Sequence, residues 1–301
     1  MIFIPFFLNI LITPFIIKFA LKFSIVDKPD NNLKNHKKIT PYLGGLSLFL
    51  SILPFYFDDL YYIIPAFIIM IIGLFDDIKN INPFFRLFVE FAVITFTVVN
   101  FHMGFSIIIN ILFIITGVAL INAVNMIDGM DGLCSGTALI SLLFFAIISK
   151  NFDILYFVFA LLGFLVFNFY PAKIFLGDAG SYLIGFTLFY NFNYLTSKSG
   201  FGGYFIGLII TAYFFTDLFF SILRRIMNDK SPFYGDKEHI YDKIRSRFNT
   251  KISTTVLINY IIVFSFGLIS WFSWFKPYLG IGIAFVLFLF TGVYFRLYKY
   301  D

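Results

Sequence analysis

Four polar residues recur at every third position between two strongly hydrophobic runs near the middle of the chain. They are Asn122, Asn125, Asp128 and Asp131. In a helix this spacing places them in a roughly coherent polar stripe. Their oxygens suit Mg²⁺, which keeps water and bridges to substrate phosphates, and the neighbouring Gly129 and Gly132 leave room for a bulky ligand. An Asp-rich loop can also be a solvated turn, but polar groups are costly between membrane spans, so we predict a functional site.

A second pair of carboxylates, Asp76 and Asp77, ends another hydrophobic run. Adjacent carboxylates raise each other's pKa unless a cation lies between them or one acts as a base. Arg86, at the start of the following run, is placed to supply a fixed positive charge to a phosphate. The alternative interpretation is an interfacial helix cap.

Three further polar segments contain candidate site residues. The segment FNFYPAKIFLGDAGS includes Asn168, offers Phe175 as a flat face for stacking a base, and places Asp178 beside two glycines. The other two segments are basic. One, before residue 45, contains Lys34, and the other, from Arg224 to Arg247, has His239 at its centre. The basic residues of the first could equally serve as a topological anchor.

The elements that must position these residues are membrane helices. The 301 residues are 60% hydrophobic and only 13% charged, against about 25% charged in ordinary soluble domains. Hydrophobic runs of about 20 residues recur along the whole length, which favours helices over a barrel. We therefore expect an all-α polytopic membrane protein with a single domain, 1–301, and the bilayer as one of its partners.

Eleven transmembrane helices are expected. They lie near residues 2–21, 43–57, 60–75, 86–100, 104–123, 133–149, 153–169, 181–196, 202–223, 253–274 and 278–296. The first has no basic residues before it and no small-residue cleavage site, so we interpret it as a retained span rather than a signal peptide. An odd number of spans puts the two termini on opposite sides.

Alternation of the loops brings the polar segments to one side of the membrane. That side receives the loops at about 22–42, 76–85, 124–132, 170–180 and 224–252. Only Lys150, Lys198 and Lys276, of 22 lysines and arginines, fall in the short links on the other side. The positive-inside rule therefore makes the long loops cytoplasmic and the N-terminus external. The same rule explains the net charge of +5 without nucleic acid as a partner.

The single cysteine, Cys134, cannot form an intrachain disulfide, so nothing indicates an oxidising compartment. Within the spans, Glu90 and Asp217 are expensive carboxylates near the cytoplasmic side. They could line a cavity there or be structural partners of nearby basic groups.

Taken together, the loops resemble the polyprenyl-phosphate N-acetylhexosamine-1-phosphate transferase family, of glycosyltransferase family 4 type. The matching motifs are DKPD…LKNHKKITPYLGG from Asp27, GLFDD from Gly73, NAVNMIDGMDGL from Asn122, NFYPAKIFLGDAGS from Asn168, and the Asp217–Arg225 segment leading into SPFYGDKEH. They occur in family order across about two thirds of the chain.

The resemblance implies a Mg²⁺-dependent reaction, with Mn²⁺ as an alternative ion. A polyprenyl phosphate such as undecaprenyl phosphate attacks the β-phosphorus of a UDP-N-acetylhexosamine and releases UMP, which initiates a cell-surface glycan such as an O-antigen or a teichoic acid. The implied location is the bacterial cytoplasmic membrane, and a homodimer is compatible with the likeness.

The resemblance also implies roles for individual residues. Asp178 corresponds to the principal Mg²⁺ ligand, with Asn125 as a second, and Asp76 or Asp77 to the group that deprotonates or orients the lipid phosphate. Asp128 and Asp131 correspond to nucleotide-site acids. Substrate contacts are implied for Lys34, Asn80 near the sugar, Arg86 at a phosphate, Asn125, Asn168, Phe175 at the uracil, and Arg224.

The sequence departs from the family pattern at its final motif. A His-x-His-His run reads His239-Ile240-Tyr241-Asp242 here, so only His239 carries over as a catalytic candidate. The muramoyl-pentapeptide transferase version of this motif is absent, which disfavours that substrate. Three alternatives stay open: synthesis of the muramoyl-pentapeptide lipid, an inactive scaffold, and a transporter or flippase. The last is disfavoured because the polar groups gather at one face and no repeat is evident.

Overall fold

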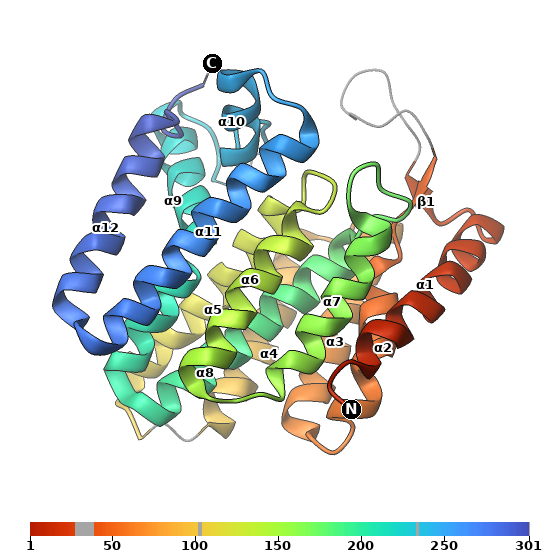
Figure 1. The fold of residues 1–301 in the computed structure, drawn as a ribbon, viewed down its shortest axis with the longest axis horizontal. Coiled ribbons are helices and arrows are strands. Elements are labelled where there is room, and N and C mark those ends of the chain that lie inside the picture. Colours follow the sequence, from red (N-terminus) through yellow and green to blue (C-terminus); the bar gives the residue numbers. More distant parts are fainter. Residues whose placement is uncertain (28–38, 102–103, 233–234, 301) are drawn as a thin grey trace.

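The protein is almost entirely helical in the computed structural model, which describes residues 1–27, 39–101, 104–232 and 235–300 (Figure 1). The helices of this part of the chain are α1 (Ile4–Lys22), α2 (Gly44–Tyr56), α3 (Leu60–Lys79), α4 (Pro83–Asn100), α5 (Ile107–Ile127), α6 (Leu133–Ser149), α7 (Ile154–Asn168), α8 (Gly177–Ile210), α9 (Ala212–Met227), α10 (Ile240–Phe248), α11 (Ile252–Phe275) and α12 (Pro277–Tyr294). Two short strands, β1 (Val26–Asp27) and β2 (Thr40–Pro41), pair antiparallel. The predicted all-α class is confirmed.

The membrane-spanning character is confirmed at a coarser level than the predicted eleven spans. Six described helices are long and apolar enough to cross a membrane, or seven if the bent pair α8 and α9 counts as one span. Three shorter apolar helices, α2, α6 and α7, add to these. Helices of this length need polar ends in the interface or a protein-lined environment.

The region predicted as spans 181–196 and 202–223 has its link where predicted, but the second span is broken. The chain reverses at Gly200, whose φ of 60° costs a glycine little, and the ring of Tyr204 packs back on that of Phe192 with centroids 5.3 Å apart. The second span is not continuous, because the helix breaks at Thr211 and α8 and α9 meet at 70°. Hydropathy missed this break because both sides of it are equally apolar.

Helix α8 forms the centre of the bundle, and most of its side chains from Ala179 to Phe192 are buried. Two glycines allow its amino-terminal end to approach neighbouring helices closely. A Cβ atom on Gly45 of α2 would lie 2.3 Å from the backbone nitrogen of Gly180, and one on Gly73 of α3 would lie 2.6 Å from Ala179. Small residues commonly permit such backbone contacts between membrane helices.

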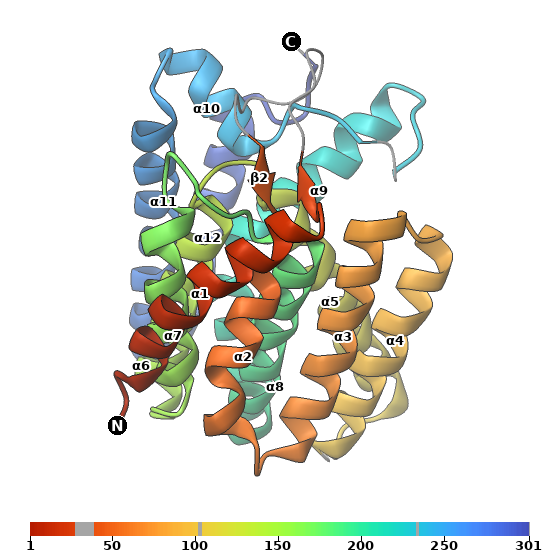
Figure 2. The same cartoon turned by 90° about the vertical axis from the view of Figure 1, so that its right-hand side faces the viewer.

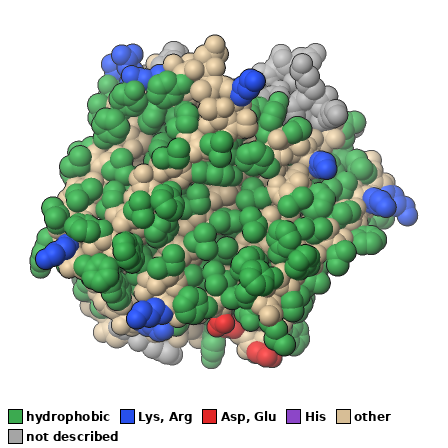
Figure 3. Space-filling model, in the orientation of Figure 1, with side chains coloured by type: hydrophobic (Ala, Val, Ile, Leu, Met, Phe, Trp, Pro, Cys, Tyr) green, Lys and Arg blue, Asp and Glu red, His purple; other side chains and the backbone are tan. Residues whose placement is uncertain are grey.

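Apolar side chains cover most of the face of the bundle that Figure 3 shows. Large hydrophobic residues such as Phe7, Phe88, Ile108 and Phe285 are each more than half exposed. A surface of this kind is unfavourable in water and is expected where lipid surrounds the protein.

The two ends of the bundle differ. The C-terminus, α10 and the two strands lie at one end, and the N-terminus lies towards the other, in both views (Figures 1 and 2). Termini at opposite ends agree with an odd number of spans.

Candidate active site

A carboxylate from α3 holds the amino-terminal end of α8. The backbone N–H groups of Asp178 and Ala179 donate to the two carboxylate oxygens of Asp77 at 2.9 and 3.1 Å. The first N–H groups of a helix have no partners within the helix, and a capping carboxylate satisfies them and interacts favourably with the helix dipole. Asp77 therefore joins the predicted second loop, 76–85, to the predicted fourth loop, 170–180, and fixes the position of Asp178.

Asp178 is also bound by the end of α5. The side-chain amide of Asn125 donates to Asp178 Oδ1 at 2.7 Å and to Ser181 Oγ at 3.0 Å. These contacts join residues that are more than 50 positions apart in the chain. The two predicted metal ligands are therefore neighbours.

Arg86 occupies the centre of a polar network beside this pair. Its guanidinium donates to Asp76 Oδ2 at 3.4 Å, to the Tyr182 hydroxyl at 3.0 Å and to Asn122 Oδ1 at 3.2 Å. The Tyr182 hydroxyl in turn donates to Asp76 Oδ2 at 2.9 Å. A guanidinium held on several sides has little rotational freedom, so Arg86 presents a fixed positive charge.

Glu90 and Tyr182 also belong to this network. The sequence singled out Glu90 only as a costly intramembrane carboxylate, and it gave no role to Tyr182. Glu90 is fully buried, lies 3.5 Å from Arg86 Nε and accepts from Asn122 Nδ2 at 2.5 Å. The signal was present in the spacing, since Glu90 follows Arg86 by four residues and Tyr182 follows Asp178 by four, which places each pair on one helix face.

The two acids of the NMIDGMDG segment differ in their partners. Asp131 Oδ2 accepts from the backbone N–H of Ala172 at 2.9 Å and so ties the fourth loop to the end of α5. The Asp128 side chain makes no hydrogen bond to any residue that the structure describes. Burial, with the nearby carboxylates of Asp178, Asp77 and Asp131, raises the pKa of Asp128 well above its ordinary value.

The fourth loop is also joined to the start of α2. Phe175 donates its backbone N–H to the carbonyl of Pro41 at 2.7 Å, and its carbonyl accepts from the N–H of Gly44 at 3.0 Å. The Phe175 ring is partly buried. Asn168 is buried and bonds Ser135 and the carbonyl of Ile174, so its contacts in the structure are within the protein.

The predicted fifth loop, 224–252, contains a second polar network. His239 Nδ1 lies 2.7 Å from Asp217 Oδ2, and Asp217 Oδ1 accepts from the N–H of Ile240 at 2.7 Å. Burial opposes the imidazolium, but the charge and hydrogen bond of Asp217, together with the charges of Asp236 and Asp242, outweigh burial and raise the pKa of His239. Asp217 therefore fixes the start of α10.

Two arginines hold the loop before His239. Arg224 is fully buried and donates to both oxygens of Asp236 at 3.0 Å and to the carbonyl of Leu297, and Arg225 also bonds Asp236. Asp236 in turn lies 3.7 Å from His239 Nε2. The guanidinium of Arg224, a predicted substrate contact, therefore donates its hydrogen bonds to groups of the protein itself.

The intramembrane carboxylates Glu90 and Asp217 are both structural partners of other side chains. Glu90 pairs with Arg86 and Asn122, and Asp217 pairs with His239. The sequence left two interpretations open for these carboxylates: they line a cavity, or they pair with nearby basic groups. The contacts favour pairing.

Of the two remaining predicted contacts, the structure describes Asn80 but not Lys34. Asn80 ends α3 with a φ of 46°, and its side chain is exposed. Lys34 lies outside the described residues, so the prediction for it stays a prediction.

The donor set fits Mg²⁺. Among the described residues no three His, Cys, Asp or Glu side chains form a metal-binding group. Mg²⁺ does not need one, because it is commonly held by one or two carboxylates, with water and substrate phosphates completing its shell. Asp178 offers a carboxylate and Asn125 an amide oxygen, and a cation bound near them would relieve the mutual repulsion of the Asp178 and Asp128 carboxylates.

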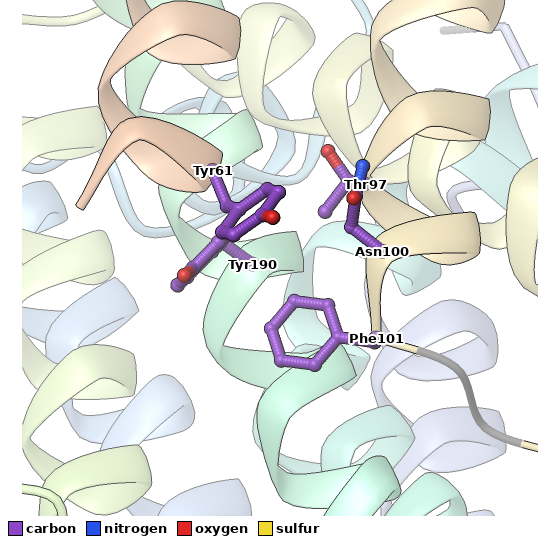
Figure 4. A pocket seen from close by; sticks show the side chains of 5 residues that line it. All are labelled: Tyr61, Thr97, Asn100, Phe101 and Tyr190. Atoms are coloured by element: carbon purple, nitrogen blue, oxygen red, sulfur yellow. The ribbon is translucent and has the colours of Figure 1, made fainter.

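A small hollow lies away from this site. Tyr61, Thr97, Asn100, Phe101 and Tyr190 surround a space of about 100 Å³ (Figure 4). Asn100 is at the far end of α4 from Arg86, roughly 20 Å along the helix by its rise per residue. The hollow shares no residue with the carboxylate site.

Comparisons with known proteins find relatives that match most of the chain. The chain is 31% identical over 265 residues to an undecaprenyl-phosphate alpha-N-acetylglucosaminyl 1-phosphate transferase of Thermotoga maritima, covering 82% of each chain. It is 29% identical over 291 residues to a probable undecaprenyl-phosphate N-acetylglucosaminyl 1-phosphate transferase of Bacillus subtilis, covering 86% of this chain and 80% of the relative. A phospho-N-acetylmuramoyl-pentapeptide-transferase of Dictyoglomus thermophilum is 28% identical over 303 residues, with 90% of this chain and 97% of the relative covered.

The family profile described as glycosyl transferase family 4 matches residues 60–195. This segment contains α3 to the first part of α8, and hence the Asp76–Asp77, Asn125 and Asp178 cluster. With these relatives and this match, the chain belongs to glycosyl transferase family 4.

Proposed function

We propose that this protein transfers an N-acetylhexosamine-1-phosphate from a UDP-sugar to undecaprenyl phosphate and releases UMP. The observation that carries the proposal is the meeting of Asp77, Asn125 and Asp178 at the amino-terminal end of α8, with Arg86 beside them. Relatives named for this reaction cover most of the chain. The product would be the first membrane-bound intermediate of a cell-surface glycan.

The reaction joins a lipid phosphate oxygen to the β-phosphorus of the UDP-sugar and breaks the bond to the UMP oxygen. Bound Mg²⁺ would neutralise the negative charge of the diphosphate and of the leaving UMP. Asp178 and Asn125 are placed to hold it. Arg86, fixed by Asp76, Tyr182 and Asn122, is placed to bind a phosphate, and Asp76 is placed to orient the lipid phosphate or accept its proton.

The proposal includes an orientation in the membrane. Eleven crossings with an external N-terminus would place the site in the cytoplasm of a bacterial cell, where UDP-sugars are made, and its lipid substrate in the cytoplasmic membrane. The basic residues of the long loops support this orientation. A homodimer remains a prediction from family likeness.

Transfer of a muramoyl-pentapeptide phosphate is the second candidate, because one relative named for that activity matches this chain over 97% of its own length. The His-rich version of the final motif that the muramoyl-pentapeptide transferases carry is absent here, which disfavours this candidate.

The test is a product assay with purified protein in detergent, undecaprenyl phosphate and Mg²⁺. UDP-GlcNAc, UDP-GalNAc and UDP-muramoyl-pentapeptide are supplied in separate reactions. We expect UMP and a labelled lipid with a UDP-N-acetylhexosamine, and loss of both when EDTA is added. Folded protein that forms neither product with any donor would contradict the transferase proposal and favour an inactive scaffold.

A further inference from the structure

Glu90 of α4 is a carboxylate buried inside the helix bundle, one helical turn from Arg86. It is fully buried and faces Arg86 on its own helix and Asn122 on α5. Burying a charge among membrane helices costs free energy even when a partner of opposite charge is present. Because replacing a buried ion pair by apolar residues is often neutral or stabilising, stability is a weak reason for a carboxylate at this position.

The direct contact between Glu90 and Arg86 is longer than a good hydrogen bond. Glu90 Oε1 lies 3.5 Å from Arg86 Nε, and neither atom has a hydrogen-bond partner among the described residues. Well-formed hydrogen bonds between charged groups measure about 2.7–2.9 Å. The two side chains therefore attract each other as charges, in a geometry that is not the one that best stabilises a buried pair.

Asn122 forms a second link between the two charges. Its Nδ2 donates to Glu90 Oε2 at 2.5 Å, and its Oδ1 accepts from Arg86 Nη2 at 3.2 Å. An ionised carboxylate can only accept hydrogen bonds, so it selects the donor end of the amide and leaves the acceptor end for Arg86. Glu90 therefore acts on Arg86 both directly and by fixing the orientation of Asn122.

The contacts of Arg86 divide between two sides of its guanidinium. Glu90 and Asn122 face Nε and Nη2, whereas Asp76 and Tyr182 accept from Nη1 at 3.4 and 3.0 Å. A guanidinium has five N–H donors, so four contacts leave at least one for a phosphate. A phosphate that arrives beside Asp76 competes with this carboxylate for Nη1, and the contacts at Nε and Nη2 then keep Arg86 in place.

We propose that Glu90 is a positioning residue, which holds the Arg86 guanidinium, directly and through Asn122, in the orientation that binds a substrate phosphate. The inference rests on the proposed function and adds to it a residue that acts through Arg86 alone. Removal of the Glu90 charge should therefore matter only while the guanidinium of Arg86 is present.

A double-mutant cycle tests this dependence. UMP release is measured in detergent with undecaprenyl phosphate, a UDP-N-acetylhexosamine and Mg²⁺ for wild type, Glu90→Gln, Arg86→Lys and the double variant. Glutamine keeps the size of the side chain and removes its charge, and lysine keeps a positive charge but lacks the planar fork that Glu90 orients. We expect Glu90→Gln to lower kcat/KM about ten-fold, since a small misplacement can cost up to about 10²-fold, and to cause no further loss in the Arg86→Lys background.

Separate KM and kcat values distinguish positioning from a structural role. A misplaced Arg86 should raise the KM of the substrate whose phosphate it binds, whereas a smaller folded fraction lowers kcat and leaves both KM values unchanged. The matched control is Thr97→Val on the same helix. Thr97 is buried and its hydroxyl bonds the carbonyl of Val93 in its own helix, so this variant should keep wild-type kinetics.

The remaining outcomes separate this proposal from the proposed function. Unchanged kcat/KM in Glu90→Gln, or equal fold losses in both backgrounds, would overturn the Glu90 assignment alone. A loss that follows a lower melting temperature, with both KM values unchanged, would also overturn it. If Glu90→Gln folds poorly, Glu90→Leu, which fills the space with an apolar side chain, supplies the same cycle. Wild-type protein that releases no UMP with any donor would overturn both proposals.

Discussion

At the scale of single residues, the carboxylates of the site have different tasks that their types alone do not reveal. Asp77 caps α8, Asp131 ties down the fourth loop, and Asp178 is held by Asn125. Asp128 has no hydrogen-bond partner among the described residues. This division depends on partners many positions away in the chain, so spacing could identify the acids but could not assign their contacts.

The His239–Asp217 contact predicts a pH-dependent contribution to stability. Because the pKa of His239 is raised on folding, its contribution is fully present below the ordinary histidine value of about 6.5 and is lost as the pH rises through the folded pKa. His239→Gln should therefore destabilise the protein most at pH 6 and progressively less towards pH 9. Melting temperatures of both proteins in detergent across this range provide the measurement.

Lys198→Gln is the matched control, because Lys198 lies at the other end of the bundle. A His239→Gln defect that grows with rising pH would contradict a charged His239 paired with Asp217.

At the scale of elements, close helix contacts bring the site together. Helices α2 and α3 reach the start of α8 through Gly45 and Gly73, and the cap from Asp77 sets where α8 begins. Hydropathy located the apolar helices, because a long apolar segment in a membrane must satisfy its backbone hydrogen bonds within itself and therefore forms a helix. It did not locate α10, which is polar. It could not locate the break at Thr211, where the composition does not change.

Gly45→Ala tests the contact between α2 and α8. The added Cβ atom would meet the backbone of Gly180 at 2.3 Å, and backbone cannot rotate away as a side chain can. We expect a loss of stability of about 1 to 3 kcal/mol, typical of overpacking, and a fall in transferase activity as Asp178 shifts. Thermal unfolding and UMP release measure the two effects.

Gly202→Ala provides the comparison, since a Cβ atom there meets nothing within 4 Å. Similar stability and activity for the two variants would show that close packing at Gly45 does not position α8.

At the scale of the whole molecule, the carboxylate site gathers the end of α3, the end of α5 and the start of α8. Apolar side chains cover most of the face that Figure 3 shows. The alternation of loops predicted that the acidic segments share one face, and the contacts among Asp77, Asp128 and Asp178 agree with it. The prediction that the site faces the cytoplasm rests on the positive charge of the long loops.

Labelling of single cysteines tests the orientation. In a Cys134→Ala background, Lys276→Cys and Asp229→Cys place an exposed thiol at opposite ends of the bundle. In intact cells a membrane-impermeant maleimide should label Lys276→Cys and should reach Asp229→Cys only after the membrane is permeabilised. The reverse pattern would contradict a cytoplasmic site.

The central claim is that the cluster at the start of α8 carries out Mg²⁺-dependent phosphosugar transfer. The most direct measurement is UMP release by wild-type protein and by Asp178→Asn, with undecaprenyl phosphate and a UDP-N-acetylhexosamine across a Mg²⁺ titration. The amide keeps the shape of the side chain but removes the charge that would hold the metal. We predict turnover that rises with Mg²⁺ in wild type and almost complete loss in Asp178→Asn at equal expression and melting temperature. Near-wild-type turnover by a folded Asp178→Asn variant would contradict the account.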